Sequence, residues 1–230
     1  MISVVIPTLQ EENYIEDTVR QFTRLSIPHE VIVSDGGSAD RTVEIARAAG
    51  AQIVLSAERK TPSHQRNAGA KQAKGEVLLF IDSSVVLPDT ESFLTAALKH
   101  FEDPAVLGYA VPQWIDPKKA TFSDRVVCTI VNWTLALSKG GSGKFVMVRR
   151  SAFEALMGFR EDLVTREDGD FYIRLNRMGE VVFDKSQFIY YSGRREHAYG
   201  WPKLLSIWMI NVIWVTLFNK ALTKEWTPVR

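Results

Sequence analysis

Short apolar runs alternate with stretches of helical periodicity through the first half of the chain. We expect the runs to be strands, and they cover residues 2–6, 31–33, 52–55, 77–81 and 105–111. Between them, apolar residues recur at spacings of three and four, as in Ile15, Val19 and Phe22, which is the pattern of a helix with one apolar face. This alternation is typical of βαβ units around a mostly parallel sheet.

Acidic residues follow three of these predicted strands. Residues 77–81 are all apolar, so this strand belongs in the middle of a parallel sheet, and it ends at Asp82. Glu11 and Asp35 follow the first and second strands in the same way. Carboxylates at the carboxyl edge of a sheet suit a ligand with hydroxyl and amide donors and a metal-bound diphosphate. The alternative for Asp35 is an Asx turn before Gly36 and Gly37.

The pattern changes after residue 112. Shorter helical stretches and short strands mix without a repeat or a low-complexity linker. The predicted helices are 126–137, 152–157 and 168–178, and the predicted strands are 145–148, 181–183 and 188–191. We therefore expect one continuous fold with two functional halves.

The last thirty residues differ from the rest of the chain. Between Leu204 and Phe218 only Ser206, Asn211 and Thr216 are polar, and at about 100° per residue they fall around the whole circumference of a helix. A helix that is apolar all round is buried in protein or in lipid. Fifteen residues span about 22 Å, less than the roughly 30 Å of a hydrocarbon core.

Aromatic and basic residues accompany this apolar run, as is typical of a membrane interface. They are Trp201, Lys203, Trp208, Trp214, Lys220, Lys224 and Trp226. One interpretation is a peripheral contact of residues 201–222 with the inner face of the cell membrane, which would bring the site to a lipid-borne acceptor. The alternative is a helix buried on the catalytic domain or in an oligomer interface.

Composition narrows the class of protein. The 230 residues include 28 Lys and Arg against 27 Asp and Glu, a formal net charge of +1, so no overall positive field exists for nucleic acid. Cys128 is the one cysteine, and the N-terminal segment has neither a basic region nor a long apolar region of a signal peptide. We expect a reducing, cytoplasmic setting.

Several motifs resemble those of family 2 glycosyltransferases, which have the GT-A fold. They are residues 4–8, 10–12, 33–42, 66–69, 80–82 and 166–175, and the resemblance covers about residues 1–195. It implies an α/β, GT-A-like, Rossmann-type sheet that is mostly parallel and flanked by helices, followed by the apolar C-terminal helix. Residues 1–112 would be the nucleotide-sugar-binding half, residues 113–200 the acceptor-binding half with the catalytic base, and residues 201–230 the apolar helix.

The resemblance also implies a donor site for a nucleotide-diphosphate sugar. Pro7, Thr8, Glu11 and Asp35 would hold the nucleoside, and Arg66 would lie near the diphosphate. The segment from Asp82 to Ser84 would hold Mg²⁺ or Mn²⁺. Arg194 and Arg195 lie in a segment that resembles the one that closes over the donor, where two arginines would neutralise the leaving diphosphate; a solvated basic turn or a headgroup contact is the alternative.

On the acceptor side, the resemblance implies that Asp168, paired with Glu167, is the general base that deprotonates the acceptor. Gly141, Ser142 and Gly143 would form a loop on the acceptor side. The implied reaction is a single displacement that inverts the anomeric centre of the sugar. The acceptor would offer a hydroxyl or a phosphate, on a glycan or on a lipid.

One position departs from the family pattern. The family usually has Asp-x-Asp where this chain has Asp82-Ser83-Ser84, so the second carboxylate is absent. A serine hydroxyl is a poorer ligand, although Mg²⁺ is often completed by water and substrate phosphates. We therefore expect weaker metal binding, with Asp82 as the main protein ligand. Two other functions remain as alternatives: a nucleotidyltransferase, and a non-catalytic sugar-nucleotide binder or membrane scaffold.

Overall fold

A run of five apolar residues forms the centre of the sheet, as its sequence predicts. In the computed structural model, which describes residues 1–56, 58 and 60–222, β4 (Val77–Ile81) is buried along its whole length. It lies between β1 (Ile2–Thr8) and β8 (Phe145–Arg149) in a seven-stranded sheet. The order of the strands is β3 (Gln52–Leu55), β2 (His29–Asp35), β1, β4, β8, β6 (Val106–Ala110) and β9 (Glu180–Phe183).

Strand direction divides this sheet into two parts. β3, β2, β1 and β4 are parallel, whereas β8 is antiparallel to both of its neighbours and β6 is parallel to β9. A second sheet of three short strands has β10 (Ile189–Tyr191) between β5 (Val85–Val86) and β7 (Gln113–Ile115). The mostly parallel α/β sheet is therefore confirmed.

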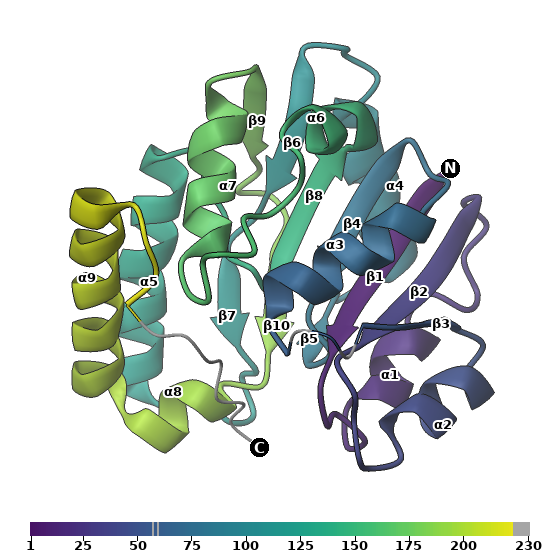
Figure 1. Cartoon of the computed structure of the whole chain (residues 1–230), viewed down its shortest axis with the longest axis horizontal. Helices are drawn as coiled ribbons and strands as arrows, with labels where there is room; N and C mark the ends of the chain where they lie inside the picture. The colour runs from purple at the N-terminus through teal and green to yellow at the C-terminus, as the bar shows by residue number, and fades with distance from the viewer. Residues whose placement is uncertain (57, 59, 223–230) are drawn as a thin grey trace.

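Helices cover both faces of the large sheet (Figure 1). One face packs on α3 (Pro62–Gln72), α6 (Arg150–Ala155) and α7 (Glu167–Asn176). The core on the other face includes side chains of α1 (Ile15–Arg20), α2 (Thr42–Ala48), α4 (Thr90–His100) and α5 (Phe122–Leu137). Alternate residues of β4 point to the two cores, with Leu78 and Phe80 in one and Leu79 and Ile81 in the other, as the pleat of a strand requires.

Three short elements were not expected from the sequence: β5, β7 and the helix α8 (Arg194–Tyr199). β1 also continues through Pro7 to Thr8, beyond the expected end at Ile6. Pairing of β1 with β4 stops at Val5, while pairing with β2 continues to Thr8. Pro7, which has no N–H, therefore lies where β1 has one neighbour instead of two.

The apolar C-terminal run forms one helix, α9 (Trp201–Phe218). It lies beside α5 on the flank opposite β3 (Figure 1). Only 17% of its residues are buried within this chain, which does not support the alternative of a helix buried on its own domain. By length and composition, α9 is the one helix among the described residues that is long and apolar enough to cross a membrane. The predictions for Lys224 and Trp226 fall outside the described residues.

Candidate active site

The predicted donor residues lie at the carboxyl edge of the parallel strands. Asp35, at the end of β2, is buried, and its carboxylate accepts four hydrogen bonds. Its Oδ2 accepts from the backbone N–H groups of Gly37 at 2.9 Å and Ser38 at 2.8 Å, and its Oδ1 accepts from the hydroxyls of Ser38 and Thr8. Gly37 has φ +87°, which a residue without Cβ adopts without strain. The structure therefore contains the Asx turn at Asp35.

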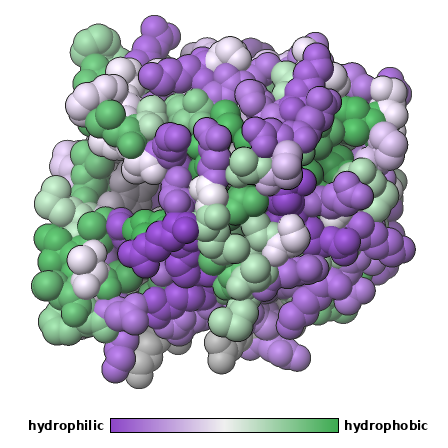
Figure 2. All heavy atoms as spheres, turned by 90° about the horizontal axis from the view of Figure 1, so that it is seen from above, coloured by the Kyte–Doolittle hydropathy of each residue, from purple (hydrophilic) through white to green (hydrophobic). Residues whose placement is uncertain are grey.

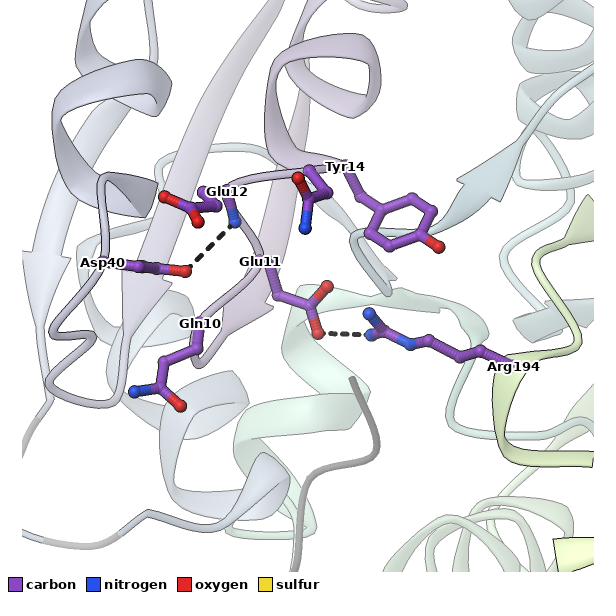
Figure 3. A pocket seen from close by; sticks show the side chains of 7 residues that line it. Gln10, Glu11, Glu12, Tyr14, Asp40 and Arg194 are labelled. Atoms are coloured by element: carbon purple, nitrogen blue, oxygen red, sulfur yellow. Dashed lines mark hydrogen bonds and ion pairs between the residues drawn. The ribbon is translucent and has the colours of Figure 1, made fainter. Parts of the chain in front are cut away.

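A cavity of about 200 Å³ opens beside this turn (Figure 3). The carboxylate of Glu11 pairs there with Arg194, whose guanidinium lies 4.9 Å from the centre of the Tyr14 ring. Within the described chain, Glu11 Oε2 and Gln10 Oε1 are buried without a hydrogen-bond partner. Because such acceptors carry a desolvation penalty, a ligand N–H or O–H group that reached either oxygen would relieve that penalty.

Arg194 and Arg195 lie in α8 instead of an exposed turn. Both side chains are half-buried, and Gly193, just before the helix, has φ +69°. Burial lowers the pKa of Arg195, against the opposing influence of Tyr199, Glu196, Asp82 and Glu167. Arg194 reaches Glu11, which is 183 residues earlier in the chain. The basic pair therefore joins α8 to the donor edge.

Arg66 is the centre of the site. Its side chain, from α3, is only 2% exposed. Nη1 donates to Glu167 Oε1 at 2.9 Å, and Nη2 donates to Asp82 Oδ1 at 3.2 Å and to the carbonyl oxygen of Gly143 at 2.8 Å. Burial lowers the pKa of Arg66, but the charges of Asp82 and Glu167 raise it, and the net shift is upward. Arg66 thus stays charged and joins the end of β4 to the start of α7.

Glu167 and Asp168 begin α7 after Arg166, whose φ is +65°. Burial and the neighbouring Asp168 carboxylate raise the pKa of Glu167 to about 7, although Arg66 lowers it. Asp168 is half-buried; its Oδ2 accepts from the Gly143 N–H and its Oδ1 from the Gly169 N–H, both at 2.7 Å. These two bonds fix the orientation of the Asp168 carboxyl at the start of α7.

The loop of Gly141, Ser142 and Gly143 fits closely around these residues. A Cβ on Gly141 would lie 2.5 Å from the hydroxyl oxygen of Tyr172, and one on Gly143 would lie 2.7 Å from Arg66 Nη2. The Ser142 hydroxyl donates to Gln113 Oε1 at 2.7 Å. The backbone of Gly143 contacts both Arg66 and Asp168, so this loop fixes Asp168 relative to the buried arginine.

The residues at the end of β4 suit a metal ion whose ligands come mainly from the bound substrate. The Asp82 carboxylate is 38% exposed, and Ser84 is half-buried in the turn that follows. Among the described residues, no group of three or more His, Cys, Asp or Glu could hold a metal ion. One carboxylate and one hydroxyl are hard oxygen donors, which fit Mg²⁺ or Mn²⁺ completed by phosphate and water.

Three residues near the site were not singled out by sequence reasoning: Gln113, Lys144 and Tyr172. Lys144 Nζ lies 3.5 Å from the buried carboxylate of Glu196 and 4.4 Å from the centre of the Tyr191 ring. Tyr172 is buried against the glycine loop. Helical spacing predicted only that Tyr172 belongs to a helix, and its position beneath the loop depends on tertiary packing.

Comparison with known proteins finds relatives along most of the chain. The chain is 27% identical over 223 residues to poly(ribitol-phosphate) beta-N-acetylglucosaminyltransferase TarS of Staphylococcus aureus, covering 84% of this chain and 36% of TarS. It is 26% identical to the succinoglycan biosynthesis protein ExoA of Rhizobium meliloti, covering 82% of this chain and 62% of ExoA. The chain thus spans less than two thirds of the length of either relative.

Solved structures share the fold. A mannosyltransferase from Pyrobaculum calidifontis, in complex with GDP-Man and Mn²⁺, superposes with a TM-score of 0.73 at 19% identity, over 92% of this chain and 64% of that one. Glucosyl-3-phosphoglycerate synthase from Mycobacterium tuberculosis, with Mn²⁺, UDP and phosphoglyceric acid, gives 0.66 at 19% identity, over 94% and 77%. Residues 3–157 match the family model described as glycosyl transferase family 2. The chain belongs to glycosyl transferase family 2.

Proposed function

We propose that this protein transfers a sugar, with inversion, from a nucleotide-diphosphate sugar to a hydroxyl or phosphate of an acceptor. One observation carries the proposal: Arg66 brings Asp82, Glu167 and, through Gly143, Asp168 together from four separate segments. The Asp82 carboxylate at the donor edge therefore lies in the same hydrogen-bonded group as the half-buried Asp168 carboxyl. The solved structures that share this fold hold GDP-Man or UDP.

Asp168 is the general base in this proposal. For a hydroxyl acceptor, Asp168 takes the proton while the acceptor oxygen forms a bond to the anomeric carbon. The bond from that carbon to the diphosphate oxygen breaks, and the nucleoside diphosphate leaves with the electron pair. Displacement from the opposite face inverts the anomeric centre. The two backbone N–H donors hold the Asp168 carboxyl in place, and a positioned general base contributes about 10²- to 10⁴-fold to the rate.

The other residues bind and orient the donor. Pro7, Thr8, Glu11 and Asp35 would line the nucleoside side, with Glu11 Oε2 still available as an acceptor. Asp82, with Ser84, would hold Mg²⁺ or Mn²⁺, which supplies positive charge for the diphosphate. Arg194 and Arg195 would supply further positive charge from α8. Glu167 acts through Arg66 and is a positioning residue.

We also propose a cytoplasmic location and an acceptor carried by a lipid, such as a polyprenyl phosphate or a glycolipid. The support is α9, which is apolar and mostly exposed and is joined to the donor edge by the six residues of α8. The expected result is faster transfer to a polyprenyl phosphate in vesicles than to a short water-soluble analogue. Equal rates with both acceptors would argue for a soluble acceptor.

The decisive experiment identifies the products. The purified full chain is incubated with a panel of nucleotide sugars, with Mg²⁺ or Mn²⁺, and phosphorus NMR follows the nucleotide. Nucleoside diphosphate release and an inverted anomeric configuration are expected. Pyrophosphate release would indicate nucleotidyl transfer, and donor binding without turnover for any acceptor would indicate a non-catalytic binder; either result would overturn the proposal.

A further inference from the structure

A stripe of exposed apolar side chains runs along α5. It consists of Phe122, Val126, Ile130, Trp133 and Leu137, and each is more than 40% exposed. At about 100° per residue these positions lie within about 80° of the helix circumference. The buried residues of the same helix, Asp124, Cys128 and Asn132, face the domain. A continuous apolar stripe of this kind on a surface marks an interaction site.

The adjacent helix α9 extends this apolar surface. Its exposed apolar residues spread over about 220° of its circumference: Leu205, Ile207, Met209, Ile210, Ile213, Trp214, Leu217 and Phe218. Hydrophobic side chains gather along the flank where α5 and α9 lie (Figure 2). We infer that α5 and α9 together form a docking surface for an anionic membrane, with both helices lying along the bilayer and neither crossing it.

Contacts along the whole of α9 support a helix that lies on the membrane. At its start, Trp201 Nε1 donates to Asp124 Oδ1 of α5 at 2.6 Å. In the middle, the Thr165 hydroxyl donates to Asn211 Oδ1 at 2.8 Å. Just beyond its end, Arg160 donates to both Asn219 Oδ1 and the Asn219 carbonyl. A helix held to the domain at three points cannot pass through a bilayer while the domain stays outside.

Polar groups on the docking surface have partners within their own helices. The hydroxyls of Thr129, Thr134, Ser206 and Thr216 donate to backbone carbonyls three or four residues earlier, at 2.7 to 2.8 Å. Such groups enter a lipid environment without losing a hydrogen bond. A partner protein would cover one strip of α9, whereas lipid can surround the wide exposed arc that α9 presents.

Charge around the surface matches an anionic membrane. Lys118, Lys119 and Arg125 lie near the start of α5 and are exposed, as is Lys203 near the start of α9. Residues 201–222 contain no Asp or Glu, and the one acidic residue of α5, Asp124, is buried and paired with Trp201 and His197. Cations beside an apolar helix are attracted to anionic headgroups by about 1 kcal/mol each.

Vesicle flotation tests the surface independently of sugar transfer, because no donor or acceptor is needed. The full chain should float with vesicles of phosphatidylglycerol and phosphatidylethanolamine, and less with pure phosphatidylcholine. The triple variant Phe122→Ser, Ile130→Ser and Trp133→Ser should lose at least tenfold in lipid partitioning, with an unchanged unfolding midpoint because these side chains are exposed. Leu55→Ser is the matched control: Leu55 is 71% exposed on β3, on the opposite flank, and its loss should change nothing.

Cysteine labelling distinguishes an α9 that lies on the membrane from an α9 that crosses it. Cys128 is 3% exposed, so Lys203→Cys and Lys220→Cys each add one reactive thiol. A membrane-impermeant maleimide added outside sealed vesicles should label both positions on bound protein. Protection of one position would show that α9 crosses the bilayer and would overturn the inference. Flotation of the triple variant equal to wild type, or a lipid-free dimer that the triple variant dissociates, would also overturn it.

Discussion

The two halves of the site hold their carboxylates in different ways. In the donor half, Asp35 is bound by groups two and three residues later in the chain. In the acceptor half, Glu167 is bound by Arg66, 101 residues earlier, and Arg66 also contacts Gly143, 77 residues later. The first arrangement forms wherever the turn forms, whereas the second exists only when α3, β4 and α7 are packed together.

Because of this difference, we expect substitutions in the two halves to affect ligand binding and catalysis separately. The Asp35 turn is built from groups close together in the sequence at the end of a parallel strand, so it should survive changes on the acceptor side, whereas Glu11 also depends on Arg194 of α8. Asp168, the proposed base, is oriented by the Gly143 N–H, and Gly143 in turn contacts Arg66. Disturbing Arg66 should therefore affect both catalysis and stability, while disturbing Asp168 alone should affect catalysis only.

The largest expected effect comes from Asp168→Asn. It should lower kcat by about 10³-fold, because the base is removed, and should change nucleotide-sugar affinity by less than about twofold. An amide is the same size and its one oxygen keeps one of the two backbone N–H bonds that Asp168 accepts, so we expect the fold to be kept. The measurement is steady-state kinetics together with calorimetric titration of the donor.

Asp170→Asn is the matched control for Asp168→Asn. Asp170 lies two residues further along α7 and pairs with Arg174 at 2.7 Å, away from Arg66. Its amide variant should keep kcat within about threefold of wild type. Equal losses in the two variants would mean that the first turn of α7 acts as a unit and that Asp168 has no special role.

Arg66→Met should give the second largest effect, on stability. It would leave the buried Glu167 without its cation, and removing one partner of a buried ion pair costs about 3 to 5 kcal/mol. Urea unfolding at pH 7.5 measures the loss. Arg66→Lys keeps the charge but not the two-pronged donor geometry, so its stability should lie between wild type and Arg66→Met. A methionine variant as stable as wild type would contradict a structural role for the pairing.

Local patterns were enough to predict much of the donor half. The apolar run of β4 predicted that this strand lies in the middle of the sheet, and Asp35 before Gly36 and Gly37 predicted the turn. The three-residue strand β7 and the two-residue strand β5 were missed, since so few residues show no periodicity. α8 was missed because its six residues lie between Gly193 and Gly200, both at positive φ, where the sequence suggests only a turn.

Long-range pairs explain what the sequence could not show on the acceptor side. The resemblance indicated that Arg66 lies near a diphosphate, but nothing in its surroundings in the sequence indicates that it pairs with Glu167. The pairing of Arg194 with Glu11 crosses 183 residues. The apolar pattern of α9 predicted a helix that is covered by protein or by lipid. Only the packing shows that the rest of the chain covers so little of α9.

The pH dependence of stability should depend on Glu167. Its pKa is raised from 4.5 to about 7 in the folded protein, so the folded state holds this proton more tightly. This tighter proton binding adds to the free energy of unfolding. The added stability is fully present below pH 4.5 and is lost as the pH rises through about 7, and it amounts to about 3 kcal/mol. Urea unfolding at pH 5 and pH 8 should show lower stability at pH 8. Glu167→Gln removes the titrating group and should flatten this change; an unaltered slope in that variant would assign it to another residue.

The smallest effect concerns Ser84, where the donor half departs from its family. If Asp82 is the main protein ligand of the metal, Ser84→Asp adds a second carboxylate, and affinity for hard cations rises with the number of charged ligands. The Mg²⁺ or Mn²⁺ concentration for half-maximal transfer should fall about tenfold, equivalent to about 1.4 kcal/mol. Ser84→Asn is the control, because asparagine has the size of aspartate without its charge. It should leave the half-maximal metal concentration within about twofold of wild type. Activity that persists in chelator and in Asp82→Ala would show that Arg66, Arg194 and Arg195 carry the charge of the diphosphate without a metal.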